Sequence, residues 1–182
     1  MNYKQWKYNK RDEYYTPTYL VEPLLKYLSK DKVIWCPFDT EDSEYVRVFK
    51  NNGIKVIYSH IWNNQNFFNY EPEEHYDIII SNPPFSLKKD ILKRLYELDK
   101  PFALLLGLPI LNYNEIQQVF IDNDSNIQLL MFNKKCTFDG NPSSFNSSYF
   151  CKDILPKQII CENIEINYIK SKMCNDLVEK GE

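Results

Sequence analysis

The sequence predicts an α/β fold built on a doubly wound, mostly parallel β-sheet. Short apolar segments alternate with amphipathic ones from residue 32 to residue 132, as strands and helices do in such a fold. The run Ile78-Ile79-Ile80 is apolar at every position, which is expected of a central strand covered on both faces. A strand at 32–36, a helix at 44–52 and a strand at 54–58 form one βαβ unit, whose crossover should be right-handed.

Apolar spacing and turn residues predict the other elements. A helix is expected over 17–28, with Thr16 as its cap and Pro17 at its first position. Pro23 should kink this helix or divide it into two short pieces, because an interior proline loses a hydrogen bond. Gly53 is placed to end the helix at 44–52. The remaining predicted elements are strands at 76–81, 102–106, 127–132 and 147–151, helices at 88–98 and 115–123, and a short strand or hairpin within 158–169.

The length and composition fit one domain. A chain of 182 residues with 43% hydrophobic residues can bury a core of ordinary size. We expect a single domain over 1–182, with an N-terminal arm at 1–13, a motif-bearing core at 14–151 and a C-terminal extension at 152–182. Basic and aromatic residues are interleaved in the arm, so that it either contacts phosphates and bases or packs as an ordinary terminus.

Charge and cysteine content exclude several kinds of protein. The 22 Lys and Arg residues against 25 Asp and Glu residues give a net charge of −3, so a nucleic-acid partner would require a local basic surface. Five cysteines without a C-x-x-C pair and only two histidines support neither a disulfide framework nor a metal site. There is no apolar run of about 18 residues and no signal sequence, so we expect a cytoplasmic protein without a membrane partner.

The strand at 76–81 leads directly into Asn82-Pro83-Pro84-Phe85. Neither proline has an N–H group, and Pro83 also keeps Asn82 out of the helical region, so the chain should stay extended and rigid beyond the strand. A short amide and an aromatic ring are thus presented at the carboxyl end of a strand, where ligands bind in open α/β sheets. The alternative is a structural turn in which Asn82 caps the following helix.

The loop after the first strand, Asp39-Thr40-Glu41-Asp42, carries three acids and no glycine. A phosphate-binding turn would have glycines and backbone N–H groups directed at an anion, so dinucleotides and ATP are poor candidates. The acids suit a cationic ligand, such as the ammonium and sulfonium groups of S-adenosylmethionine. The alternative is a solvated turn in which Asp39 or Ser43 caps the next helix.

Two motifs together resemble a known family. Ser81-Asn82-Pro83-Pro84-Phe85 after a buried strand is similar to the catalytic motif of S-adenosylmethionine-dependent amino-methyltransferases, chiefly the adenine-N6 enzymes of DNA and RNA. Tyr15-Thr16-Pro17 resembles the cofactor-side motif that precedes their first strand, and the order of the two motifs is that of the gamma-type enzymes, among which the chain is similar to small phage-encoded proteins. The resemblance covers residues 14–151 and implies a Rossmann-like methyltransferase sheet with one antiparallel strand near the C-terminus.

The resemblance also implies roles for the motif residues. Methylation of an exocyclic amine needs the nitrogen lone pair directed at the methyl donor, and hydrogen bonds from the amine to Asn82 Oδ1 and the Pro83 carbonyl would achieve this. Pro83 and Pro84 would hold these acceptors rigidly, and Phe85 would stack on an adenine flipped into the site. The cofactor would be S-adenosylmethionine. Its contacts would come from Tyr15, Thr16, Pro17, Cys36, Pro37, Phe38, Asp39, Asn66 and Phe67.

The cofactor side departs from the family pattern. Cys36 replaces an acid, the residues from Asp39 to Ser43 replace a glycine-rich loop, and Asn66 replaces an aspartate. The second strand ends without the acid that usually binds the ribose, and His60 is either a ribose contact or an ordinary loop histidine. Three functions therefore stay open. They are adenine-N6 methylation in nucleic acid, with DNA favoured over RNA, a catalytically silent methyltransferase-fold protein that binds nucleic acid or a host protein, and methylation of guanine-N2 or protein glutamine.

Overall fold

The computed structural model describes residues 15–138, 141–142 and 145–165. The strands are β1 (Val33–Cys36), β2 (Lys55–Tyr58), β3 (Ile78–Ser81), β4 (Phe102–Gly107), β5 (Gln128–Phe132), β6 (Thr137–Phe138), β7 (Asn141–Pro142), β8 (Ser147–Lys152) and β9 (Ile159–Glu162). The α-helices are α1 (Thr18–Val21), α2 (Glu44–Asn51), α3 (Lys88–Leu98) and α4 (Asn114–Ile121). The 3-10 helices are η2 (Glu22–Tyr27), η3 (Ile61–Asn63), η4 (Phe85–Leu87) and η5 (Leu108–Asn112).

Seven strands form one mixed sheet in the order β2-β1-β3-β4-β8-β5-β9. The first four in this order are parallel, β8 is antiparallel to β4 and β5, and β9 is parallel to β5. The chain passes from β1 outward to β2 and then crosses to β3 on the other side of β1, so the winding reverses between β1 and β3. Such a reversal is where doubly wound sheets bind ligands. The predicted α/β class, with an antiparallel strand near the C-terminus, is confirmed.

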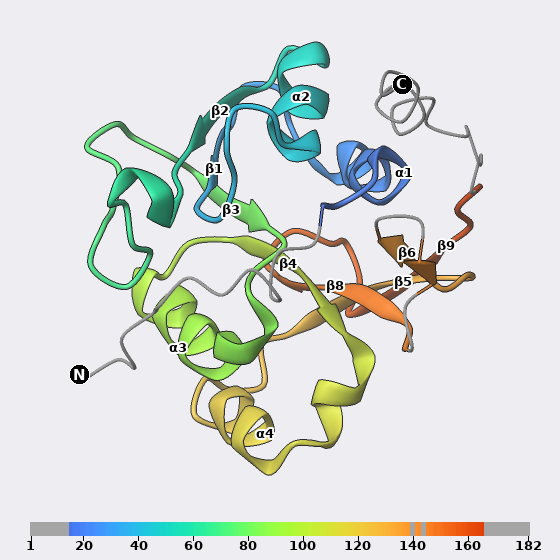
Figure 1. Cartoon of the computed structure of the whole chain (residues 1–182). Coiled ribbons are helices and arrows are strands. Elements are labelled where there is room, and N and C mark those ends of the chain that lie inside the picture. Colours follow the sequence, from blue (N-terminus) through green and yellow to red (C-terminus); the bar gives the residue numbers. More distant parts are fainter. Residues whose placement is uncertain (1–14, 139–140, 143–144, 166–182) are drawn as a thin grey trace, which may run out of the picture.

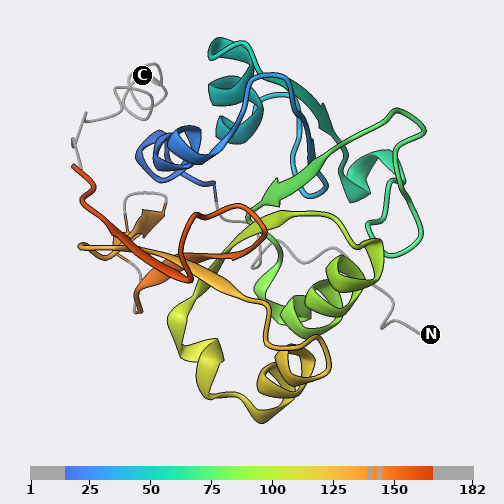
Figure 2. The ribbon, with the colours of Figure 1, turned by 180° about the vertical axis from the view of Figure 1, so that it is seen from behind.

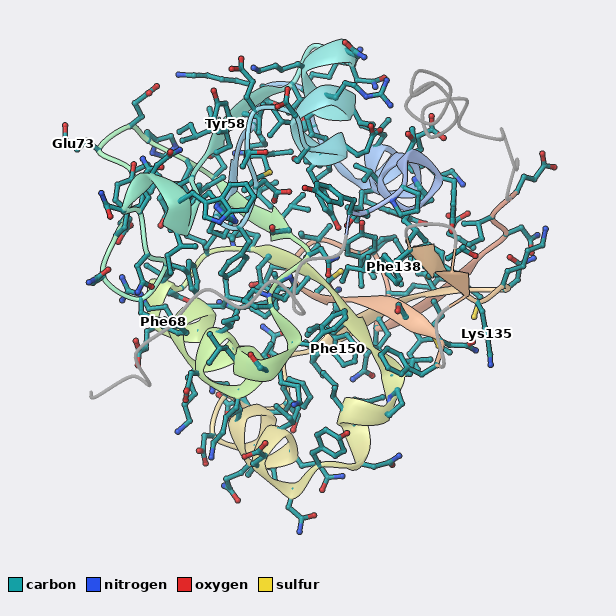
Figure 3. All side chains as sticks on the ribbon, in the orientation of Figure 1. Tyr58, Phe68, Glu73, Lys135, Phe138 and Phe150 are labelled. Atoms are coloured by element: carbon teal, nitrogen blue, oxygen red, sulfur yellow. The ribbon has the colours of Figure 1, made fainter. Side chains whose placement is uncertain are left out.

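Helices cover both faces of the sheet, with α1 and α2 on one side and α3 and α4 on the other (Figures 1 and 2). Successive strand residues point alternately to two separate cores. Ile34 and Cys36 belong to the core with α1 and α2, whereas Trp35 belongs to the core with α3 and α4. Phe150, which is labelled in Figure 3, lies in this second core. Its ring stacks on that of Phe120 of α4 at a centroid distance of 6.5 Å. Burial of each such side chain contributes about 1.5–3 kcal/mol.

The first helical segment is divided into two short pieces, as the interior proline predicts. α1 ends at Val21 and η2, which has Pro23 in its first turn, continues to Tyr27. The predicted cap was wrong, because Pro17 occupies the N-cap position with extended backbone and no side-chain cap. Thr16 is instead buried and hydrogen-bonded to Tyr45, so its hydroxyl joins a polar group inside the protein rather than the helix end.

Helix α2 ends as predicted, because Gly53 follows it with a φ of +74° that side-chain-bearing residues rarely adopt. Within the described residues, no helix has the length and apolar character needed to cross a membrane. The predicted N-terminal arm lies outside the described residues. In the described part of the tail, up to residue 165, one short strand is present, β9, and it forms the edge of the sheet next to β5.

Candidate active site

The segment Asn82 to Phe85 follows β3 as an extended, proline-fixed link. Pro83 and Pro84 are buried, and Pro84 has φ −60° and ψ 120°. The N-cap positions of η4 and α3 are Pro84 and Leu87, and neither receives a side-chain cap. Asn82 therefore does not cap the following helices, so the capping role in the structural alternative is wrong.

The side chain of Asn82 is directed into the protein at the end of β3. Its Oδ1 atom is buried and accepts no hydrogen bond from the described residues, while other contacts of the residue hold it in place. Phe85 is half-buried, and its ring meets that of Phe145 edge-on at 6.3 Å. An amide and a partly exposed ring are thus presented together where the winding of the sheet reverses.

Asp39 joins the first loop to the strand that carries the motif. The Ser81 hydroxyl, at the end of β3, donates a hydrogen bond to the Asp39 carboxylate. Asp39 is only 8% exposed, and its backbone N–H also donates to the carbonyl of Ser59 beyond β2 at 3.2 Å. The carboxylate therefore lies where the ends of β1, β2 and β3 converge, directly before Asn82.

The other acids of this loop face solvent. The side chain of Glu41 is 71% exposed and is paired with Lys50 at 3.5 Å, and Asp42 is exposed. Ser43 caps α2 by accepting a hydrogen bond from the backbone N–H of Val46 at 3.3 Å. The interpretation as a helix cap thus applies to Ser43. The interpretation as a ligand-facing acid applies to Asp39, which alone among the acids of this loop is buried beside the end of β3.

Two buried tyrosines connect the cofactor-side motif to the other half of the sheet. Thr16 is hydrogen-bonded to Tyr45 of α2, whose hydroxyl lies 2.8 Å from that of Tyr149 in β8. Burial raises the pKa of both tyrosines well above its ordinary value, so both hydroxyls are protonated. Tyr15 is 67% exposed and Pro17 is half-buried. Of the three motif residues, Thr16 is the one fixed inside the fold.

Cys36 and Pro37 are buried, and Phe38 is half-buried. Burial raises the pKa of the Cys36 thiol well above its usual range, and the negative charge of Asp39 adds to this effect. The thiol is therefore neutral and does not replace an acid. The ring of Phe38 packs against that of Phe67 at 5.0 Å.

Asn66 and Phe67 have mainly structural contacts. The Asn66 side-chain oxygen accepts a hydrogen bond from the backbone N–H of Phe68 at 3.0 Å, which fixes a local turn. Phe67 is fully buried, and its ring packs on that of Trp35 at 5.6 Å. Of the three rings of Trp35, Phe38 and Phe67, only that of Phe38 keeps exposed surface.

The loop after β2 is also fixed by its own hydrogen bonds. His60 is buried, and its Nδ1 accepts a hydrogen bond from the backbone N–H of Trp62 at 3.2 Å, which caps η3. The Trp35 indole N–H donates to the Ser59 hydroxyl at 2.9 Å within the core. The geometry favours the interpretation of His60 as a structural loop residue.

A close approach at the end of β4 shapes the acceptor side of the site. A Cβ atom added to Gly107 would lie 2.5 Å from the ring of Phe145, so any residue larger than glycine at this position would displace the ring. The backbone N–H of Leu108 donates to the carbonyl of Asn146 at 2.9 Å and ties the two segments together. Phe145, which packs against Phe85, therefore lines the acceptor side together with the motif.

Sequence reasoning placed Ser81 at the start of the motif but did not predict its contact with Asp39, and it did not identify Tyr45 as part of the site. The signal for this contact was available, because Ser81 ends β3 and Asp39 closely follows the end of the neighbouring parallel strand β1, and such ends meet at one edge of a sheet. The Tyr45 contact with Tyr149 spans 104 positions and has no local sequence signal.

A surface hollow of about 710 Å³ lies away from these residues. It is at the opposite end of the sheet, where β5 begins and β8 ends. Its lining comes from Lys26, Tyr27, Leu28, Ser29, Gln128, Asp153, Ile154, Leu155 and Pro156. None of the candidate site residues contributes to it. Among the described residues, no group of three or more His, Cys, Asp or Glu side chains is arranged to hold a metal ion.

No family model matches the chain, and no curated protein matches its sequence. A proposed class I S-adenosylmethionine-dependent methyltransferase from Listeria monocytogenes is 12% identical with a TM-score of 0.48, and the match covers 80% of this chain and 63% of that one. The modification subunit of a proposed type I restriction enzyme from Vibrio vulnificus YJ016 is 11% identical with a TM-score of 0.50, covering 88% and 49%. A release-factor-specific protein-(glutamine-N5) methyltransferase from Alicyclobacillus acidocaldarius is 15% identical with a TM-score of 0.38, covering 73% and 89%.

The chain thus spans about half the length of the Vibrio subunit and less than two thirds of the Listeria protein. At 11% identity, the similarity to the modification subunit concerns the fold alone. The chain has a Rossmann-like α/β fold.

Proposed function

We propose that this chain is an S-adenosylmethionine-dependent methyltransferase whose acceptor is the N6 amine of adenine in nucleic acid, with DNA favoured over RNA. The observation that carries the proposal is the position of the segment Asn82 to Phe85, at the carboxyl end of β3 beside the reversal of the sheet. Ligands of doubly wound sheets bind at this place. The Ser81 bond to Asp39 adds a buried acid of the neighbouring loop to the same place.

The acceptor residues suit an amine that is a poor nucleophile. Hydrogen bonds from the amine to Asn82 Oδ1 and to the Pro83 carbonyl direct the nitrogen lone pair away from the purine ring and toward the methyl donor. Pro83 and Pro84 are buried and hold both acceptors in place. Rigid placement of two bound reactants can remove about 7–11 kcal/mol from a barrier. Stacking on Phe85 is worth about 1–3 kcal/mol per base and offsets part of the cost of unstacking the target.

Three residues of the cofactor side fit S-adenosylmethionine. The buried Asp39 carboxylate suits its ammonium or sulfonium group, and the partly exposed Phe38 ring suits its adenine. Thr16, the third, is held inside the fold by its hydrogen bond to Tyr45. The cofactor, when bound, supplies an electrophilic methyl group. We assign Cys36 to packing beneath this site, since its thiol is buried and neutral.

The second candidate is a catalytically silent protein with this fold that binds nucleic acid or a protein. The neutral Cys36 thiol and the capping role of His60 favour it, because neither residue supplies the acid that the methyltransferase resemblance implies at that position. Titration calorimetry with S-adenosylmethionine separates the two candidates. Dissociation constants in the micromolar range support the enzyme, and absence of binding supports the silent protein.

Transfer of a labelled methyl group then tests the acceptor. The protein is incubated with labelled cofactor and with separate pools of DNA, RNA and protein, and we expect N6-methyladenine in DNA. Asn82→Ala should lower the rate by about 100-fold or more, as when a positioned hydrogen-bonding group is removed from an active site. Its cofactor affinity should stay unchanged. The control Asn51→Ala alters an exposed asparagine at the end of α2 and should keep full activity.

Two results would contradict this proposal. Label that enters only protein would exclude adenine as the acceptor, and full activity of Asn82→Ala would exclude the mechanism. Loss of activity in Asn82→Ala counts only if its melting temperature matches that of the wild type, because Asn82 directly follows a fully buried strand.

A further inference from the structure

Lys88 and Tyr113 meet beside the acceptor side of the site. Lys88 is the first residue of α3, and Tyr113 lies between η5 and α4. The two segments leave the carboxyl ends of β3 and β4, and α3 and α4 lie side by side (Figures 1 and 2). The Lys88 ammonium lies 5.1 Å from the centre of the Tyr113 ring and 3.4 Å from the carbonyl oxygen of Phe85. The pair is therefore joined directly to the last residue of the motif.

Within the part of the chain that the structure describes, Lys88 has no acidic partner. Among the described residues, no carboxylate lies within ion-pair distance of its ammonium group, whereas the next residue, Lys89, pairs with Glu115 at 3.4 Å. The contacts of Lys88 are a ring face and a carbonyl oxygen, which leave its positive charge available to an anion. In a chain of net charge −3, such a local charge matters more than the overall balance.

The Tyr113 ring has surface left for a ligand. It is 44% exposed although Lys88 covers part of one face. Together with Phe85 and Phe145, it places three aromatic rings and one lysine along the same edge. Stacking rings interleaved with positive charge are typical of sites that bind single-stranded nucleic acid without sequence preference. A glutamine side chain in a protein needs neither an ammonium group nor a stacking ring.

We propose that Lys88 and Tyr113 bind the nucleotide next to the target adenine, with Lys88 on its phosphate and Tyr113 stacked on its base. This inference rests on the proposed function and specifies its substrate as a single-stranded or locally opened nucleic acid. Lys88 also holds the Phe85 carbonyl, so the neighbouring nucleotide and the target base are positioned by one connected set of residues.

Fluorescence anisotropy with end-labelled 12-mers, each with one adenine among thymidines or uridines, tests this without any methyl transfer. Tyr113→Ala should weaken binding about tenfold, in line with the 1–3 kcal/mol of one base stack, and Tyr113→Phe should keep the affinity. A plot of the logarithm of the association constant against the logarithm of the salt concentration has a slope that reports the number of phosphate contacts. Lys88→Gln should reduce the magnitude of this slope by about 0.7, which is the value for one phosphate of a single strand. Lys88→Arg should retain the slope. The control Lys30→Gln removes an exposed lysine in the loop before β1, at the opposite end of the sheet.

Wild-type affinity and salt slope in both Tyr113→Ala and Lys88→Gln would overturn the inference. It would also be overturned if the wild-type protein bound neither the DNA nor the RNA oligonucleotide. The proposed function fails separately, through absent methyl transfer or through label in protein alone. Melting temperatures of the variants should stay close to that of the wild type, because Tyr113 is exposed and the half-buried Lys88 contacts only the Tyr113 ring and the Phe85 carbonyl among the described residues.

Discussion

Ser81→Ala should destabilise the protein by about 1.5–3 kcal/mol, the usual contribution of a hydrogen bond to a charged group. Ser81 is fully buried, and its hydroxyl donates to the Asp39 carboxylate, which is itself largely shielded from water. Alanine removes the donor and leaves the carboxylate in place. In a chain of 182 residues, 1 kcal/mol corresponds to about 2–4 °C, so the melting temperature should fall by about 3–12 °C.

Urea unfolding at pH 7, followed by circular dichroism and tryptophan fluorescence, measures this loss. The midpoint should fall while the slope m stays constant, because the exposed surface of the unfolded state does not change. Ser148→Ala is the matched control. Ser148 is a buried strand serine whose hydroxyl forms no hydrogen bond among the described residues, so its removal should change stability by less than about 0.5 kcal/mol.

A double-mutant cycle with Asp39→Asn isolates the bond itself. Ser81→Ala should cost less when Asp39 is already an amide, and the coupling should be about 1 kcal/mol. Equal losses in Ser81→Ala and Ser148→Ala, or a coupling near zero, would refute the argument that this bond holds the first loop against β3.

Three other changes test the surroundings of the site. Gly107→Ala should displace the Phe145 ring, because the added Cβ atom would clash with it. The rate of methyl transfer should fall, and the free energy of unfolding should fall by about 1–3 kcal/mol. An unchanged rate of methyl transfer would contradict this. Tyr149→Phe should cost about 1–3 kcal/mol in urea unfolding, because Tyr45 loses its hydroxyl partner, whereas the double Phe variant should cost less than the sum of the singles. A backbone hydrogen bond lowers the pKa of Asp77 to about 2, so Asp77→Asn should be destabilising at pH 7. The advantage of the wild type should shrink as the pH falls from about 4 toward 2, and an advantage independent of pH would exclude the carboxylate as its source.

The strands were predictable because their cause is local. Ile78 to Ile80 are apolar at successive positions, and the structure buries all of them in the middle of the sheet. The division of the first helix was predictable for the same reason, since a proline in a helix interior removes a backbone hydrogen bond and Pro23 falls inside the apolar helical pattern. The order of the strands is different. It depends on which apolar faces pack together, and no single segment of the sequence contains that information.

The site was predictable in outline but not residue by residue. Three acids in one loop look alike in sequence, and only the turn after β1 determines that Asp39 points inward while Glu41 faces solvent. Phe67 and Phe38 are likewise equivalent aromatic residues in sequence, yet one is fully buried and the other keeps exposed surface. Side-chain direction at loop positions depends on tertiary contacts, which is why the candidate cofactor residues divide into packing and contact positions only in the structure.

The position of Asp39 changes how the departures on the cofactor side are understood. Cys36, which stands where the methyltransferase resemblance implies an acid, is part of the core, and the first inward-facing acid comes three residues later. Asp39 accepts a hydrogen bond from Ser81, which is the residue before Asn82, so the negative charge of Asp39 is held beside the segment from Asn82 to Phe85. A cation that binds Asp39 would therefore act on the end of β3 through one hydrogen bond. It follows that Ser81 links Asp39 to the end of the strand that leads into Asn82, so that a substitution of Ser81 or Asp39 should alter the position of both segments.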